Sequence, residues 1–302
     1  MALDVQIIVN ACAGTARETE IITWLQNYLS AKPTWQLGIA RTGDALLKLA
    51  DSAARNDCET VVAAGGDGTV NAVASAILHT GKTLAVLPIG TLNHFAKDLH
   101  LPLDIETAVE TITTGRVIRV DVGQVNDLLF VNNSSLGLYP RIVNEREKQQ
   151  RLGWGKWPGF LWAALLVLRR YPLVDVTLMI DATTFACRTP FVFVGNNKYE
   201  MEGFRIGARE RLQAGVLSVY LTESTDRLGL LRLAFRALFG GVRREKDFAA
   251  LLTREVSIKT HRRRLHVATD GEVSTLQPPL VYRILPNALK VIVPAPAVNR
   301  GD

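Results

Sequence analysis

The first 125 residues alternate short runs of β-branched and aliphatic residues with amphipathic stretches of helical spacing. Apolar runs of strand character occur at 5–10, 36–41, 60–66 and 83–88, and helices are predicted to begin near Thr15, Thr42 and Gly68. Buried strands that alternate with helices indicate a parallel sheet covered on both faces. Such sheets bind ligands at the carboxyl ends of their strands, so we expect a site there.

Beyond Arg116 the pattern changes to longer strand-like segments, interrupted by predicted helices at about 155–170 and 226–252. This change predicts an α/β chain with an N-terminal parallel-sheet domain and a second, β-rich domain of the sandwich type. We find no internal repeat and no low-complexity linker. The expected boundaries are 1–125 for the first domain, with 286–302 as a candidate completion of it, and 126–285 for the second.

The composition fits a folded chain of about two domains, since 48% of the 302 residues are apolar and 21% are charged. Cys12, Cys58 and Cys187 lie far apart and fit neither a zinc site nor a disulfide framework, which favours a cytoplasmic location. The N-terminus lacks the basic segment and apolar stretch of a secretory signal. The longest apolar run, 158–168, is too short to span a bilayer.

The net charge of +6 and the pI of about 9.3 suit nucleic acid, anionic lipid or a polyphosphate. Basic residues cluster at Arg243–Arg244 and at His261–Arg264, without regular aromatic interleaving. Such runs are usually solvated faces, so we do not expect nucleic-acid binding.

The strand predicted at 60–66 ends in a turn that reads Gly65-Gly66-Asp67-Gly68-Thr69 and leads into a helix. Glycines let the backbone approach a ligand closely, and a helix N-terminus directs N–H groups at an anion, so the turn is suited to phosphate. No Lys follows the glycines, and Asn71 stands where a Rossmann fingerprint has its third glycine. The turn therefore belongs to neither of these two nucleotide-binding classes.

Asp67 is the informative residue of this turn, because a carboxylate repels phosphates unless a divalent cation lies between them. The sequence thus implies Mg²⁺, held by Asp67 directly or through water. The alternative interpretation is a tight strand-to-helix turn in which Asp67 serves as a cap.

A second turn of the same kind, Pro88-Ile89-Gly90-Thr91-Leu92-Asn93, follows the strand at 83–88. The first strand ends at Asn10, and Arg41-Thr42-Gly43 follows the second. Four small or polar turns at successive strand ends are hard to explain by packing alone. We expect them to meet at one edge of the sheet.

The two glycine turns and a late Asp270-Gly271-Glu272, in this order and at these separations, resemble the diacylglycerol kinase catalytic domain, which is shared with sphingosine and ceramide kinases. The resemblance covers nearly the whole chain and implies an ATP-dependent lipid kinase. It implies an N-terminal nucleotide-binding domain, a C-terminal β-sandwich and an active site in the cleft between them. The residues that it places around ATP are Asn10, Thr42, Gly65, Gly66, Asp67, Gly68, Thr69, Asn71, Gly90, Thr91 and Asn93.

The resemblance also implies an acidic base in the segment Thr269–Glu272, where either Asp270 or Glu272 can take the proton of the acceptor hydroxyl. Without the resemblance, Asp270-Gly271 is equally typical of a type I′ hairpin turn. Asp121 is a second candidate near the metal, because in the family it shares a carboxylate and water network with Asp67.

Two departures from the family pattern concern metal. His94 stands where many members have the third carboxylate of that network, and Leu212-Gln213-Ala214-Gly215 replaces an acidic pair before Gly that binds a structural Mg²⁺. We therefore expect the structural metal to be absent or weakened. The Mg²⁺ bound with ATP needs only Asp67, phosphates and waters, so activity is expected to remain.

A lipid substrate implies peripheral contact with an anionic membrane surface. Arg232 and Arg236 lie four residues apart in an apolar helix predicted within 226–252, and Trp154, Trp157 and Trp162 cluster in the other predicted helix. Both patterns are typical of interfacial helices, and core packing is the competing interpretation of each. The segment 196–203 is predicted to be a loop that either contacts substrate or has no role.

Two other functions remain open from the sequence. One is a kinase of a soluble substrate, similar to NAD kinase, which shares Gly-Gly-Asp-Gly-Thr; the turn at 88–93 argues against it. The other is a lipid-binding regulator that kept the fold and lost turnover, which His94 and Ala214 suggest. The presence of Asp67, Thr91 and the two acids at 270 and 272 argues for activity.

Overall fold

The structure is a computed structural model, and it describes residues 4–12, 15–137, 173–180, 183–199, 209, 211–221 and 249–296. The chain divides into two compact units. The first unit comprises residues 1–120 and 287–302, and the second comprises residues 121–286. Strands β5 (Arg116–Val125) and β16 (Leu280–Val293) each begin in one unit and end in the other.

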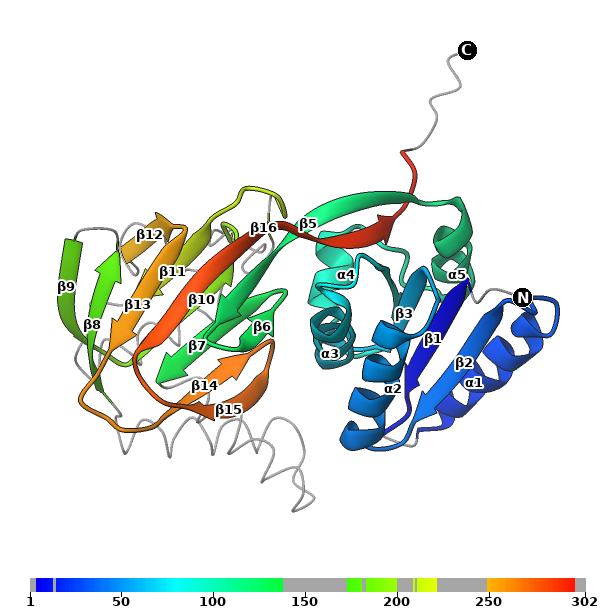
Figure 1. Ribbon diagram of the computed structural model, residues 1–302, viewed down its shortest axis with the longest axis horizontal. Coiled ribbons are helices and arrows are strands. Elements are labelled where there is room, and N and C mark those ends of the chain that lie inside the picture. The colour runs from blue at the N-terminus through cyan, green and yellow to red at the C-terminus, as the bar shows by residue number, and fades with distance from the viewer. Residues whose placement is uncertain are drawn as a thin grey trace, which may run out of the picture. The chain divides into compact units, whose positions relative to one another are not determined.

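The first unit is built on parallel strands in the order β2-β1-β3-β4. Their bounds are Trp35–Ala40 for β2, Val5–Asn10 for β1, Thr60–Gly65 for β3 and Thr83–Pro88 for β4. Strand β16 adds to β4 in parallel through Lys290 and Val291. Because the strands run the same way (Figure 1), their carboxyl ends share one edge. The parallel sheet predicted from the sequence is confirmed.

Helices cover both faces of this sheet. Leu25 of α1 (Ala16–Leu29) and Val109 of α5 (Ile105–Thr114) are buried in one cluster with Ile7 and Leu87 of the sheet. The other face is covered by α2 (Gly43–Arg55) and α3 (Asp67–Ile77), which also pack on each other. The five-residue helix α4 (His94–Asp98) follows β4. Coverage on both faces explains why β3 and β4 read as unbroken apolar runs.

The second unit is a β-sandwich, as expected. Among the described strands, one sheet has the antiparallel order β12-β11-β10-β7-β14-β15, and strands β13, β8 and β9 extend antiparallel from β16 in the other. Strands β5 and β6 form a hairpin beside β16. The bounds are Leu128–Phe130 for β6, Asn133–Gly137 for β7, Val174–Ile180 for β8, Thr183–Thr189 for β9, Phe191–Asn196 for β10, Leu217–Leu221 for β11, Ala249–Thr253 for β12, Glu255–Lys259 for β13, Leu265–Thr269 for β14 and Glu272–Leu276 for β15.

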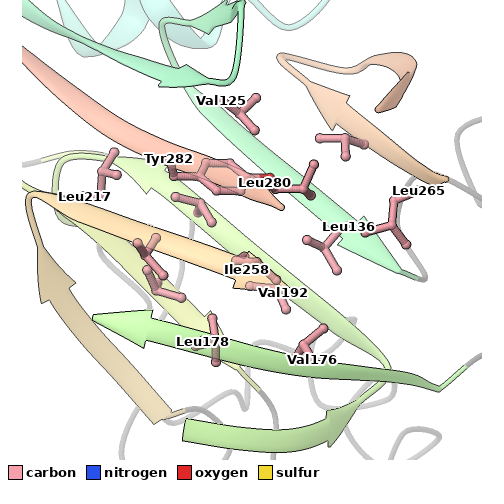
Figure 2. Close-up of a cluster of buried hydrophobic side chains, with 14 of the residues drawn as sticks. Val125, Leu136, Val176, Leu178, Val192, Leu217, Ile258, Leu265, Leu280 and Tyr282 are labelled. Atoms are coloured by element: carbon pink, nitrogen blue, oxygen red, sulfur yellow. The ribbon is translucent and has the colours of Figure 1, made fainter. Parts of the chain in front are cut away.

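The core of the second unit lies between the two sheets, and Figure 2 shows side chains from both of them converging there. Val176 and Leu178 come from one sheet, and Val192 comes from the other. Tyr282 is fully buried among them, and its hydroxyl lies 3.2 Å from Ser134 Oγ in the opposite sheet. Burial raises the pKa of Tyr282 well above its usual value, and the bond to Ser134 offsets only part of that rise.

One prediction about this unit is wrong in part. The helix predicted over 226–252 overlaps β12, whose residues from Ala249 onward pair with β11. A short apolar run fits a buried strand as well as a helix, and strand pairing decides the outcome here. The rest of that segment and the predicted helix at 155–170 lie outside the described residues. The two helices expected to contact the membrane are therefore not described. Within the described ranges, no helix has the length and apolar character needed to cross a membrane.

Candidate functional site

The N-terminus of α3 differs from those of the other long helices in the first unit. The N-cap side chains of α1, α2 and α5, which are Thr15, Thr42 and Asp104, each accept a backbone N–H of the first turn. The N-cap of α3 is Gly66, which offers no side-chain acceptor. A helix N-terminus that its own sequence does not cap is suited to bind an anion, because its first N–H groups and the helix dipole both favour negative charge.

The two glycine turns touch through their backbones. A Cβ placed on Gly90 would lie 2.3 Å from Gly66 Cα and 2.9 Å from Gly66 N, closer than real side chains approach a backbone. Only glycine fits at position 90 without movement of one turn. The structure therefore brings the 65–69 turn and the 88–93 turn together at the carboxyl edge of the sheet.

Asp67 joins the same two turns. Its Oδ2 accepts the N–H of His94 at 3.1 Å, and its Oδ1 accepts the N–H of Phe95 at 3.0 Å. Asp67 thus caps the neighbouring helix α4 rather than its own helix. The side chain is partly exposed, so the arrangement is compatible with a cation bound through water.

Asn93 closes the second turn in the left-handed region, with φ of 52°. Its Nδ2 donates to the carbonyl oxygens of Pro88 at 3.1 Å and Gly90 at 2.9 Å. Its Oδ1 is buried and has no hydrogen-bond partner among the described residues. A buried acceptor without a partner is unfavourable by about 1–3 kcal/mol, so a donor from water or from a ligand would stabilise this turn.

Asn10 and Thr69 bond to each other at the end of β1. Asn10 Nδ2 donates to Thr69 Oγ1 at 2.8 Å, and Asn10 Oδ1 accepts the N–H of Cys12 at 3.1 Å. The Thr69 side chain is only 3% exposed and lies against Gly65, where a Cβ would approach its Oγ1 to 2.2 Å. The bond between the two side chains thus joins the end of β1 to the first turn of α3.

The remaining predicted residues of the first unit lie along the same edge. Thr42 is exposed, and its Oγ1 accepts the N–H of Ala45 at 3.1 Å. Thr91 is exposed, Gly68 is partly exposed, and the Oδ1 of Asn71 accepts a bond from Ser75 Oγ at 3.0 Å within α3. Exposed hydroxyls of Thr42 and Thr91 thus lie on the same edge of the sheet as the packed glycines.

In the second unit, Asp270 and Gly271 form a two-residue turn between β14 and β15. Their φ angles are 49° and 90°, and the flanking Thr269 and Glu272 are paired across the hairpin. Positive φ at both positions is the geometry of a type I′ turn. The hairpin interpretation of this segment is correct.

The two acids of this segment, Asp270 and Glu272, lie in different surroundings. The Asp270 carboxylate accepts three backbone N–H groups, from Val131 at 2.7 Å, Asn132 at 2.8 Å and Asn133 at 2.9 Å. Glu272 is exposed. Asp270 is therefore held as an anchor, whereas Glu272 is accessible to a substrate.

Asp121 is 1% exposed and lies in the second unit, under the loop 212–215. Its Oδ2 accepts the N–H of Gly215 at 2.7 Å, and its own N–H donates to the Leu212 carbonyl at 2.9 Å. The carboxylate thus binds directly to the loop whose sequence departs from the acidic pair expected for a structural Mg²⁺. Across the described parts of the chain, no group of three or more His, Cys, Asp or Glu side chains could hold a metal ion.

Sequence reasoning missed two buried residues near this turn. The sequence predicts only that Asn196 begins a loop, yet its Nδ2 donates to the carbonyls of Asp121 at 2.8 Å and Val131 at 2.9 Å. Arg209 bonds to the same Val131 carbonyl. Their partners lie 65 to 78 residues away in sequence, so no local pattern signals these contacts.

Two family models match the chain. The one described as "Diacylglycerol kinase catalytic domain" matches residues 4–125. The one described as "YegS C-terminal NAD kinase beta sandwich-like domain" matches residues 139–293. Their matched residues correspond to the α/β part and the sandwich part of the fold.

Among curated relatives, a protein from Klebsiella pneumoniae (strain 342) named "Probable lipid kinase YegS-like" is 34% identical over 42% of this chain and 42% of its own length. A protein from Staphylococcus carnosus (strain TM300) named "Diacylglycerol kinase" is 29% identical over 62% of this chain and 61% of its own length. The matches thus span about two-fifths and three-fifths of these relatives.

Among solved structures, a diacylglycerol kinase from Bacillus anthracis strain Sterne superposes with a TM-score of 0.70 at 22% identity and covers 98% of both chains. A yeast NADH kinase complexed with NADH superposes with a TM-score of 0.57 at 11% identity, covering 98% of this chain and 84% of that one. At these identities the likenesses show the fold.

Proposed function

Because the chain belongs to the diacylglycerol kinase catalytic-domain family, we propose that it transfers the γ-phosphate of ATP to the hydroxyl group of a lipid such as diacylglycerol. The observation that supports this most directly is the backbone contact of Gly66 and Gly90, with Asp67 joining both turns. This contact holds the two turns together beside the N-terminus of α3, which no N-cap side chain closes. That N-terminus suits the phosphates of a nucleotide.

In the first unit, the N–H groups at the start of α3 bind phosphate oxygens, and Thr42 and Thr91 contribute exposed hydroxyls. Asp67 would hold Mg²⁺ through water, since its carboxylate already caps α4. When bound, Mg²⁺ neutralises the charge on the phosphates during transfer. Asn10 and Thr69 act by keeping the end of β1 against α3.

In the second unit, Glu272 is the general base that takes the proton of the acceptor hydroxyl. A base must reach its substrate, which fits an exposed carboxylate better than one bound to three backbone N–H groups. Asp270 serves to fix the turn that carries Glu272. This assignment narrows the two candidates from the sequence to one.

Two alternatives differ in the product they predict. A kinase of the NAD kinase type would phosphorylate a soluble nucleotide, and its support here is a shared fold at 11% identity. A lipid-binding regulator would form no product, and its support is His94, whose exposed side chain stands where the family has a carboxylate. The turn at 88–93 argues against the NAD kinase type, and the presence of Asp67, Thr91, Asp270 and Glu272 argues against the regulator.

The test is to incubate the protein with γ-labelled ATP, Mg²⁺ and a total lipid extract, then separate organic and aqueous phases. Label in the organic phase supports the proposal, and mass spectrometry of that product identifies the lipid. Label on a soluble nucleotide supports the NAD kinase type, and no transfer supports the regulator. A Glu272→Gln protein is the control for a contaminating kinase.

The proposed membrane contact has a candidate surface within the described residues. The connection from β13 to β14 carries exposed Arg262, Arg263 and Arg264, with exposed Lys259 just before it. Arg262 is held by its bond to the Leu173 carbonyl at 3.2 Å. Each cation near an anionic membrane contributes about 1 kcal/mol, so this cluster alone gives measurable binding.

Co-sedimentation with vesicles tests this surface. We expect binding to vesicles that contain anionic lipid, and loss of that binding in a protein with Arg263→Glu and Arg264→Glu. A control with Lys48→Glu and Arg55→Glu, two exposed cations of α2, changes the net charge equally and should still bind. Equal loss in both proteins would mean that only the overall charge matters.

A further inference from the structure

The segment Val131–Asn133 leads from β6 into the start of β7, and two charged side chains form hydrogen bonds to it. From one direction, the Asp270 carboxylate accepts the N–H groups of all three residues. The N–H of Asp270 also donates to the Asn133 carbonyl at 2.9 Å. The position of the Asp270 turn therefore depends on the position of this segment.

From the other direction, the guanidinium of Arg209 binds the same segment. Its Nη1 donates to the Val131 carbonyl at 2.6 Å, and its Nη2 donates to Asn132 Oδ1 at 2.9 Å. Arg209 is only 6% exposed, and its guanidinium lies 5.7 Å from the ring centre of Tyr199. A cation is rarely so buried unless its hydrogen bonds are satisfied.

A single peptide group connects Arg209 to Asp270. The carbonyl of Val131 and the N–H of Asn132 belong to the same peptide unit, so Arg209 binds one end of it and Asp270 binds the other. A positive charge at the carbonyl and a negative charge at the N–H both strengthen the dipole of that unit. The two charged side chains thus stabilise each other through the peptide that separates them.

Asn196 completes this arrangement. Its Nδ2 donates to the Val131 carbonyl at 2.9 Å, so that carbonyl accepts both Arg209 and Asn196. The Nδ2 also donates to the Asp121 carbonyl at 2.8 Å. A carbonyl oxygen has two lone pairs, and the two donors fill both.

We infer that Arg209 is a positioning residue for Glu272, acting through the Val131–Asn132 peptide and the Asp270 carboxylate. The hairpin geometry carries the effect onward, because only the two turn residues separate Thr269 from Glu272 and both are held at positive φ. Displacement of the peptide moves the turn and with it the exposed carboxylate. The inference rests on the proposed role of Glu272 as the base.

The experiment compares Arg209→Met and Arg209→Lys with the unaltered protein. Methionine keeps the length of the side chain without donors, and lysine keeps the charge but replaces the planar fork with a single point of donation. We expect kcat to fall on the order of 10²-fold in Arg209→Met, with a smaller fall in Arg209→Lys. The KM for ATP should stay unchanged, because the nucleotide residues lie in the first unit. Arg283→Met, which removes an exposed ion pair with Glu255 in the same unit, should leave kcat unchanged.

A second measurement does not depend on activity. Amide hydrogen exchange by NMR should become faster by about tenfold or more at Val131, Asn132 and Asn133 in Arg209→Met, because their bonds to Asp270 open more often. Amides of β1 and β3 serve as the internal reference and should not change. Unchanged exchange at 131–133 would overturn the inference, even if the variant is less stable.

The two measurements also separate this inference from the proposed function. If the unaltered protein phosphorylates no lipid, the proposed function fails, and the exchange rates still decide whether Arg209 holds the turn. If it is active, a double-mutant cycle completes the test, since Arg209→Met combined with Asp270→Asn should lose less kcat than the product of the two single losses. Fully multiplicative losses, or an equal fall of kcat in Arg283→Met, would contradict the inference.

Discussion

The two units present their candidate site residues in opposite ways. In the first unit, glycines bring two turns into backbone contact, and the groups offered to a ligand are mostly backbone N–H groups and short hydroxyls. In the second unit, one exposed carboxylate is carried on a turn that is fixed by buried charged and amide side chains. Under the proposed function, the first arrangement would bind a ligand mainly through backbone groups, whereas the second would position one carboxylate.

Because of this difference, the two units should be sensitive to different kinds of substitution. At the edge of the first unit, an added methyl group is the most damaging change, because there is no room between the turns. In the second unit, loss of a hydrogen-bonding group is the most damaging change, because three N–H groups depend on one carboxylate.

The largest effect is expected at Glu272. Glu272→Gln should lower kcat by about 10²- to 10⁴-fold, the usual contribution of a general base. Because glutamine keeps the size of the exposed side chain, the melting temperature should change little. Lipid phosphorylation and thermal unfolding measure the two quantities. Normal activity in Glu272→Gln would remove the second unit from the chemistry.

Unlike Glu272→Gln, Asp270→Ala should lower the stability of the protein as well as its activity. It leaves three backbone N–H groups near Val131 without their acceptor, which we expect to lower the free energy of unfolding by on the order of 3 kcal/mol. Urea denaturation of Asp270→Ala and Glu272→Gln side by side measures this difference. Equal stability of the two proteins would mean that Asp270 is not an anchor.

Gly90→Ala is the corresponding test of the first unit. The new methyl group would meet Gly66 backbone and Asn93 Oδ1, so one turn must move, and overpacking of this kind is unfavourable by about 1–3 kcal/mol. ATP binding should weaken at the same time, because the anion site is formed by the moved turn. Denaturation and nucleotide titration measure the two effects.

Gly43→Ala is the matched control for stability. Gly43 is the first residue of α2, and a Cβ there meets no atom within 4 Å. Alanine should therefore be neutral or slightly stabilising. If Gly43→Ala and Gly90→Ala are equally destabilised, the tight approach of the two turns does not explain the choice of glycine.

The two units also differ in how much of their site the sequence could predict. The parallel sheet, the sandwich and the meeting of the glycine turns follow from local patterns: apolar runs, helix spacing and Gly-Gly-Asp-Gly within a few residues. The Asp270-Gly271 hairpin was also readable, because Asp-Gly favours positive φ at both positions. The cap that Asp67 provides to α4 could not be predicted, since the alternative interpretation of the sequence was a cap within its own turn.

The supports of the second unit could not be predicted, because they connect residues far apart in the chain. Asp270 binds a segment 137 to 139 residues earlier, and Arg209 reaches 78 residues back to Val131. Arginine at such a position reads as a surface residue until the fold buries it. The assignment of the base to Glu272 rather than Asp270 depended on these contacts.

Thr42→Ala should have a moderate effect. Thr42 Oγ1 caps α2 through the N–H of Ala45, and loss of such a cap lowers the free energy of unfolding by about 1 kcal/mol. If the exposed hydroxyl also contacts ATP, the KM for ATP should rise in Thr42→Ala. Thr42→Ser keeps the hydroxyl and should restore both quantities, whereas recovery of stability alone would limit Thr42 to a structural role.

The smallest effect concerns the reactivity of cysteines in the folded protein. Cys12 is exposed, whereas Cys58 is 2% exposed and bonded to Lys82, whose Nζ lies 3.6 Å from its sulfur. Burial raises the pKa of the Cys58 thiol, and Lys82 offsets only part of that rise. A raised pKa means less thiolate at a given pH, and the thiolate is the reactive form.

Iodoacetamide at pH 8 should therefore label Cys12 before Cys58, as followed by mass spectrometry. Because Cys58 is buried in the first unit, between α2 and β3, its labelling should begin only when that unit unfolds in denaturant. Gly90→Ala should shift this onset to lower denaturant, whereas Asp270→Ala should not. A shift caused by Asp270→Ala would show that the two units unfold together, and the contrast between them would then hold for chemistry but not for stability.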